Sequence, residues 1–149
     1  MNTPLQRACT FLFVPGNRSE RFRKALASGA DAVILDLEDA VPLNDKAMAR
    51  EAMAQAWAGF SADERARSVI RINPVGTPWH DDECAWLPSL EGLGAVMLPK
   101  AETTADVTRL ARHTPVIALI ETALGVSRAG YGTVDLDAET ISIERDWNA

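Results

Sequence analysis

Residues 32–41, AVILDLEDAV, contain the two features that decide the fold. The first half is a short run of apolar and β-branched residues, which is typical of a buried strand. Asp36, Glu38 and Asp39 follow at its end. Because side chains along a strand point to alternating faces, we expect Asp36 and Glu38 on one side of the sheet and Asp39 on the other. The stretch predicts a buried strand that ends in acidic groups.

Similar apolar runs recur along the chain, with longer helical patterns between them. This order predicts β/α units around a parallel sheet, and therefore an α/β fold. The expected strands are residues 11–14, 32–37, 68–73, 95–99, 115–121 and, with a weaker pattern, 131–136.

The helical patterns have recognisable ends. Asn17 and Glu20 have the spacing of a capping box, so the first helix is expected to begin there and to end near Gly29. Pro88 should shorten or bend a helix over residues 82–90, and a Thr cap should open a helix over 103–113. A helix over 45–60 presents an apolar stripe that we expect in the core. Its members are Met48, Ala52, Met53, Ala56, Trp57 and Phe60.

The connection between the last two expected strands is unusually short. Only residues 122–130 separate them, whereas a crossover between parallel strands normally takes about a dozen residues including a helix. These nine residues are expected to reach along the sheet without forming a normal packing helix.

Composition excludes several functional classes. The 149 residues are 47% apolar, enough for one globular domain with a core. The net charge of −6 argues against nucleic acid as a partner, although the basic cluster 18-RSERFRK-24 is suited to an anionic small molecule. The sequence has no stretch that predicts a membrane span and no signal-peptide pattern, so a cytoplasmic protein is expected. Cys9 and Cys84 have neither metal-site spacing nor a disulfide framework.

Polar residues gather where the expected strands end. In parallel α/β folds, ligands bind beyond the carboxyl ends of the strands. Carboxylates at one rim need a cation or an arginine, and oxygen ligands without His or Cys suit Mg²⁺ or Mn²⁺. Asp39 and Glu102 are equally well explained as helix caps or solvated groups, and His80 and His113 as ordinary loop and helix-end residues. The rim residues are Pro15 to Arg18, Asp36, Glu38, Asp39, Arg71, Asn73, Lys100, Glu102, Glu121 and Asp135.

Several motifs together resemble the HpcH/HpaI aldolase and citrate lyase β-subunit family. The resemblance implies a TIM (β/α)₈-type barrel that uses Mg²⁺, with Mn²⁺ as an alternative, to break or form carbon–carbon bonds in acyl-CoA thioesters such as citryl-CoA or malyl-CoA. It also implies a homo-oligomer, a trimer or hexamer, or association with other lyase subunits. The motifs are 12-LFVPGNR-18, 32-AVILDLEDAV-41 with Lys46, Ala49 and Arg50, 70-IRIN-73, 97-MLPKAE-102, 118-ALIETALGV-126 and 132-GTVDL-136.

Matching positions carry the roles that the resemblance implies. Glu121 and Asp135 match the metal ligands, and Glu121 and Arg71 are the candidate catalytic residues. Arg71 matches the arginine that holds the substrate's carboxylate or thioester oxygen. The remaining positions are substrate-binding Phe13, Arg18 and Lys24, which match contacts to coenzyme A, and Asp36, Glu38 and Lys100, which are expected near the metal.

The chain also departs from the family pattern. A complete barrel has about 250 residues, so residues 1–149 are expected to form one partial barrel of about six units. Residues 137–149 are a divergent tail that is expected to supply no further barrel strand. An inactive relative, or a partial subunit that needs a partner chain, is therefore the alternative function. An aldolase acting on a free 2-oxo acid is a further one. The acyl group and the choice among cleavage, condensation and thioester hydrolysis stay open.

Overall fold

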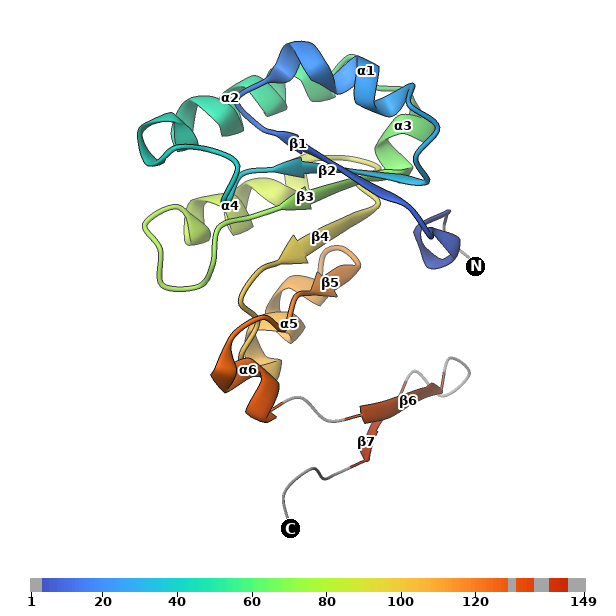
Figure 1. The fold of residues 1–149 in the computed structure, drawn as a ribbon, viewed down its shortest axis with the longest axis vertical. Coiled ribbons are helices and arrows are strands. Elements are labelled where there is room, and N and C mark those ends of the chain that lie inside the picture. Colours follow the sequence, from blue (N-terminus) through green and yellow to red (C-terminus); the bar gives the residue numbers. More distant parts are fainter. Residues whose placement is uncertain (1–3, 129–130, 136–139, 145–149) are drawn as a thin grey trace.

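Five parallel strands form the central sheet in a computed structural model of the chain, in the order β1-β2-β3-β4-β5 (Figure 1). The structure describes residues 4–128 and the backbone of 131–135 and 140–144. The expected α/β class with a parallel sheet is confirmed. The strands are β1 (Phe11–Pro15), β2 (Ala32–Asp36), β3 (Ser68–Arg71), β4 (Ala95–Leu98) and β5 (Val116–Ala118).

The sheet is open, with β1 and β5 at its two edges. The register pairs Pro15 with Asp36 and Asp36 with Arg71, so the carboxyl ends of the first three strands lie side by side. This alignment places the acidic end of β2 directly beside the arginine that ends β3.

Helices fill the connections between the strands, and Figure 1 shows α1 and α2 along one side of the sheet. No helix among the described residues has the length and apolarity needed to cross a membrane. The α-helices are α1 (Phe22–Leu26), α2 (Lys46–Trp57), α3 (Ala62–Ala66), α4 (His80–Trp86), α5 (Thr104–Ala111) and α6 (Ala123–Arg128). Short 3₁₀ helices are η1 (Pro4–Arg7), η2 (Ser19–Arg21), η3 (Leu43–Asp45) and η4 (Leu87–Ser89).

The two faces of the sheet are buried to very different extents. Val33, Leu35 and Leu37 point to one face, where they pack with helix residues such as Phe22 and Met53 in the larger core cluster. Ile34 and Val69 point to the other face, where a much smaller cluster lies. On that second face, at the β1 edge, Phe11 remains 43% exposed. Asp36 lies two residues after Ile34 and Arg71 two residues after Val69, so both point to this second face, and the candidate site lies there.

Several helix predictions are confirmed. Pro88 lies in η4, which follows a short α4 as expected. Thr103 caps α5 by accepting a hydrogen bond from the Asp106 backbone N–H. In α2, Met53 and Trp57 are buried, but Met48 is 56% exposed, so its assignment to the core was wrong.

The capping box predicted for the first helix was wrong. Asn17 donates its amide to Asp45 at 3.0 Å, and Glu20 pairs with Arg18 at 2.7 Å, so neither side chain caps the helix. A capping box does occur at Ser61 and Glu64, where it begins α3, a helix that the sequence reading overlooked. A side chain that is hydrogen-bonded to another residue cannot also cap the helix at its own position.

The expected sixth strand is not part of the parallel sheet. The backbone of β6 (Tyr131–Asp135) pairs in antiparallel fashion with β7 (Thr140–Glu144) in a separate two-stranded sheet. The parallel sheet therefore has five strands instead of six, and the tail contains a strand that the sequence reading did not expect. Residues 123–128 form the helix α6, which is only six residues long and buries only Gly125, so this connection does not contain a normal packing helix, as expected.

Candidate functional site

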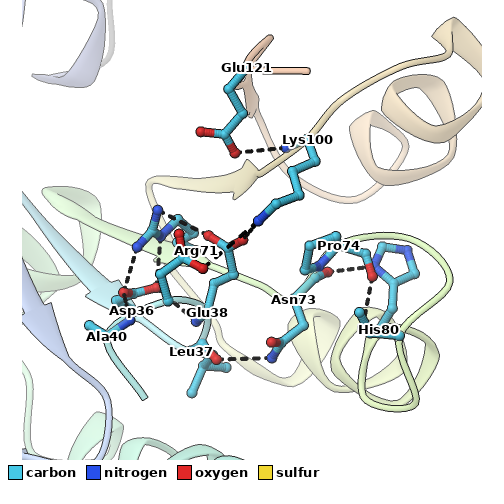
Figure 2. A network of polar contacts seen from close by, with 12 residues as sticks. Asp36, Leu37, Glu38, Ala40, Arg71, Asn73, Pro74, His80, Lys100 and Glu121 are labelled. Carbon is cyan, nitrogen blue, oxygen red and sulfur yellow. Dashed lines mark hydrogen bonds and ion pairs between the residues drawn. The ribbon is translucent and has the colours of Figure 1, made fainter. Parts of the chain in front are cut away.

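Asp36 is the most completely bound carboxylate at the strand ends. It is fully buried, and its two oxygens accept hydrogen bonds from Arg71 Nε at 2.7 Å and Nη2 at 2.6 Å. The same oxygens accept the backbone N–H groups of Glu38 at 2.8 Å and Ala40 at 3.0 Å. Figure 2 shows this fork. Asp36 thus fixes both the turn after β2 and the orientation of the guanidinium.

Glu38 lies between two cations. Its Oε2 is 3.0 Å from Arg71 Nη1, an ion pair without good hydrogen-bond geometry. Its Oε1 accepts a hydrogen bond from Lys100 Nζ (Figure 2). Because Glu38 is only 3% exposed, these two cations compensate a charge that would otherwise be costly to bury. Of the acids that end β2, Asp36 and Glu38 are thus held internally, whereas Asp39 is exposed.

Arg71 is oriented on several sides but retains free donors. Its guanidinium carbon lies 4.9 Å from the ring centre of Phe13 on β1. Burial opposes its charge, but the hydrogen bond to Asp36 and the nearby carboxylates outweigh burial and raise the pKa of Arg71. Two of the five N–H groups of the arginine donate to Asp36, and Nη1 forms the ion pair with Glu38, so further N–H groups are left for a ligand.

Lys100 adopts an unusual backbone conformation at the end of β4. Its φ of 49° lies in the left-handed region, which is uncommon for a residue other than Gly. The backbone N–H donates to Glu121 Oε1 at 3.0 Å, while the side chain reaches Glu38. The hydrogen bond to Glu38, outweighing the opposing effect of burial, raises the pKa of Lys100. One residue thereby joins the ends of β2, β4 and β5.

Glu121 offers a carboxylate to the rim. It is exposed, and only its Oε1 has a protein partner in the described part of the chain. Asp135, the other residue predicted as a metal ligand, ends β6 and its side chain lies outside the described residues. No group of three or more His, Cys, Asp or Glu side chains within residues 4–128 is placed to hold a metal ion. Among the described residues, Glu121 thus offers one free carboxylate oxygen at the rim.

Arg18 and Lys24 are not part of this cluster. Arg18 pairs with Glu20 at 2.7 Å, and both side chains are largely exposed. Lys24 is exposed on α1 and has no side-chain partner in the described part of the structure. Phe13 is the only one of the three expected coenzyme A contacts that touches Arg71.

A buried polar layer lies beneath the site, and of its members the sequence reading placed only Asn73 at the rim. Lys46 donates from Nζ to the carbonyls of Leu37 at 2.8 Å and Glu38 at 2.6 Å. Asn73 donates from Nδ2 to Leu37 O at 3.0 Å and to Glu83 Oε1 at 2.7 Å. These bonds hold the backbone between Asp36 and Glu38, and Figure 2 shows the one from Asn73 to Leu37.

The same layer contains groups with shifted pKa values. Burial raises the pKa of Glu83 and lowers that of Lys46. An acid in the first turn of α4 and a lysine at the start of α2 look like ordinary helix-end charges in sequence, so only the distances reveal their role.

The model of the HpcH/HpaI aldolase/citrate lyase family matches residues 9–131 of this chain. The chain belongs to this family. A citrate lyase subunit beta-like protein of Mycobacterium tuberculosis is 46% identical over 117 residues, which are 77% of this chain and 39% of that protein. A (3S)-malyl-CoA thioesterase of Cereibacter sphaeroides is 32% identical over 121 residues, covering 79% and 42% of the two chains.

Solved structures of the citrate lyase family share the fold. The crystal structure of CitE from M. tuberculosis in complex with magnesium, acetoacetate and coenzyme A superposes with a TM-score of 0.65 and 44% identity. The match covers 80% of this chain and 42% of that one. The chain thus spans about two fifths of the length of its citrate lyase relative. The expected membership of the HpcH/HpaI aldolase/citrate lyase family and the expected TIM-barrel-type fold are confirmed.

Proposed function

We propose that this chain carries part of the active site of a Mg²⁺-dependent carbon–carbon lyase that acts on 3-hydroxyacyl-CoA thioesters. The observation that carries the proposal is Arg71 at the strand-end rim, oriented by Asp36 and Glu38, with N–H groups that donate to neither of them. An arginine held in this way is suited to an oxygen on which negative charge develops.

The reaction needs such a group at the thioester carbonyl. In retro-Claisen cleavage the 3-hydroxyl loses its proton, the bond between C2 and C3 breaks, and the electron pair passes to the thioester as an enolate. A proton then converts the enolate to the product thioester. Arg71 binds the enolate oxygen more strongly than the neutral carbonyl, and this difference lowers the barrier. Burial of the Asp36–Arg71 pair keeps the donors fixed during the charge shift.

The donor chemistry of the rim fits a hard divalent ion. Glu121, with one oxygen free, and Asp135 would hold it, since carboxylate oxygens are the ligands that Mg²⁺ prefers. When bound, the ion would add Lewis-acid stabilisation of the same oxygen. Lys100 holds Glu121 through its backbone N–H and so positions this ligand.

Phe13, Arg18 and Lys24 would contact the coenzyme A part. The ring of Phe13 packs against Arg71, and Arg18 is exposed on the stretch that follows β1. Lys24 has a free ammonium group on α1. These two cations would supply phosphate contacts on an otherwise acidic protein.

Thermal unfolding with Mg²⁺ and acetyl-CoA tests whether the chain assembles this site. A ligand that binds only the folded state raises its stability by about 2.7 kcal/mol at a hundredfold excess over Kd. We expect the midpoint to rise with both ligands, and the Mg²⁺ effect to disappear in Glu121→Gln. Glu51→Gln, which removes an exposed charge on α2, is the matched control and should keep the shift.

Turnover is measured separately with citryl-CoA and malyl-CoA. Mg²⁺-dependent release of the acyl-CoA product, lost in Arg71→Lys, is the expected result. Free 2-oxo acid aldol substrates, assayed in parallel, cover the aldolase alternative. A cooperatively folded chain that binds neither ligand and cleaves none of these substrates would refute the proposal.

A second candidate is a non-catalytic relative, or a partial subunit completed by a partner chain. It is favoured by the pairing of β6 with β7, which leaves the β5 edge without a sixth strand. Both forms predict a folded chain without turnover. A partial subunit gains activity when a partner supplies the missing strands, whereas a non-catalytic relative does not.

A further inference from the structure

The cavity between α4 and α5 contains a second cluster of reactive side chains, separate from the strand-end site. It has a volume of about 420 Å³. Ligand sites for small molecules start at about 300 Å³, so this volume accepts a small organic group. Its lining residues are Asp81, Cys84, Ala85, Arg109, Leu110 and His113.

Cys84 in this cavity is paired with a buried histidine. Its Sγ lies 3.4 Å from His80 Nε2, one helical turn away on α4. The other ring nitrogen, Nδ1, lies 2.8 Å from the carbonyl oxygen of Asn73. Because a carbonyl can only accept, Nδ1 carries a proton, and in the neutral ring Nε2 is the acceptor that faces the thiol. His80 is only 3% exposed, so its orientation is fixed.

A guanidinium group lies on the other side of the sulfur. Arg109 Nη2 is 3.6 Å from Cys84 Sγ and 3.1 Å from Asp81 Oδ1. The Arg109 side chain is 54% exposed, and most of its N–H groups have no protein partner in the described structure. A guanidinium with free N–H groups beside the sulfur can bind the carboxylate of a reagent that reaches the thiol.

Two further observations support a reactive thiol. The hydrogen bond with Cys84, opposed by burial, raises the pKa of His80 and makes it a better proton acceptor. Cys84 is partly exposed, so a reagent can reach it. Cys9 is the internal contrast, because its Sγ donates to the carbonyl of Arg7 and, within the described residues, has no hydrogen bond with a histidine or arginine side chain.

We propose that Cys84 is a site of reversible thiol modification, which takes small disulfides carrying a carboxylate, with His80 as the base and Arg109 as the carboxylate contact. The Cys84 thiol gives its proton to His80 Nε2, and the sulfur attacks one sulfur of the disulfide. The disulfide S–S bond breaks as the mixed disulfide forms. The released thiolate takes the proton back from the imidazolium, so no other oxidant is needed.

The test compares two probes on single-cysteine proteins. Cys9→Ser leaves Cys84 as the reactive thiol, and Cys84→Ser leaves Cys9. Oxidised glutathione carries carboxylates, whereas hydroxyethyl disulfide is neutral. Adduct formation is followed by intact mass and peptide mapping. We expect oxidised glutathione to modify Cys84 about tenfold faster than Cys9, and a reducing thiol to remove the adduct.

Variants separate the roles of the two neighbours. His80→Asn should slow the reaction of Cys84 with both probes to the level of Cys9. Arg109→Gln should slow oxidised glutathione but leave hydroxyethyl disulfide nearly unchanged, a charge preference that a purely structural role would not alter. Arg112→Gln, at the end of the same helix and exposed, is the matched control.

Arg109 and Arg112 are both exposed, so these two variants keep the test valid even if His80→Asn does not fold. Equal rates for Cys84 and Cys9 in folded protein would overturn the proposal. An unchanged probe preference in Arg109→Gln would overturn the assigned carboxylate contact.

Discussion

At the scale of the residue, Arg71 determines how the acids of β2 are tolerated. Asp36 is fully buried and Glu38 nearly so, and Arg71 binds both. Removing one partner of a buried ion pair leaves an uncompensated charge, which is far more costly than losing an exposed pair.

Arg71→Met is therefore expected to lower the free energy of unfolding by about 3 kcal/mol. The measurement is urea unfolding at neutral pH. Arg18→Met removes an exposed arginine–glutamate pair and is expected to cost less than about 1 kcal/mol. Equal losses in the two variants would show that the buried network does not contribute as described.

Glu83 makes stability depend on pH in a defined direction. Burial raises its pKa from the ordinary value of 4.5, so the folded protein holds this proton to a higher pH than the unfolded chain does. In the interval above 4.5 the folded state binds more protons, and the free energy of unfolding falls as pH rises. Wild type should lose stability relative to Glu83→Gln from acid to neutral pH. A difference in the free energy of unfolding between wild type and Glu83→Gln that stays the same at every pH would contradict this.

Sequence reading reached some of these residues and not others. Asp36, Arg71 and Glu121 could be found because charged groups end strands that are otherwise apolar. The pairing of Arg71 with both acids could not be read, because it depends on the register of β2 against β3. Glu83 gave no signal, since a buried acid in a helix looks like any other helical acid until its partners are known.

At the scale of the element, the turn after β1 is built around a glycine. Gly16 N–H donates to Asp36 O at 2.7 Å, so the two backbones are in direct contact. A Cβ on Gly16 would lie 2.7 Å from this same oxygen and 2.9 Å from Leu37 Cδ2. The turn therefore has no room for a side chain.

Gly16→Ala is expected to destabilise the protein by about 2 kcal/mol, because the backbone of β2 must shift. Gly59→Ala is the control, since its Cβ would meet a flexible arginine side chain at 3.2 Å. Its cost should stay within about 0.5 kcal/mol. Chemical denaturation measures both losses. A larger loss for Gly16→Ala indicates a backbone clash, whereas equal losses indicate a general effect of replacing glycine.

Elements were predictable where a pattern was local and repeated. The first five strands were found because each is a short apolar run. The cap of the first helical segment was predicted wrongly, because Asn17 and Glu20 bond to residues that sequence spacing did not indicate. The pairing of β6 with β7 was missed because Ile141 and Ile143 alternate with polar residues over only five positions of an otherwise polar tail, which is a weak strand signal.

At the scale of the whole molecule, the two faces of the sheet contribute unequally to stability. Ile34 and Phe11 lie on the same face, but Ile34 is 1% exposed and Phe11 is 43% exposed. Ile34→Ala should cost about 3 kcal/mol. Phe11→Ala should cost less, although it removes a larger side chain. Urea unfolding of both variants measures the difference, and the reverse order would mean that the β1 edge is packed in solution.

The strand order of the sheet also has a consequence for biosynthesis. Every strand from β2 to β5 pairs with the strand that precedes it along the chain. During translation the earlier partner has therefore always left the ribosome first, and each new unit meets a finished edge on which to form its hydrogen bonds. The sheet can therefore assemble in the order of synthesis. Each new strand pairs with the strand made just before it and does not have to wait for a distant segment of the chain.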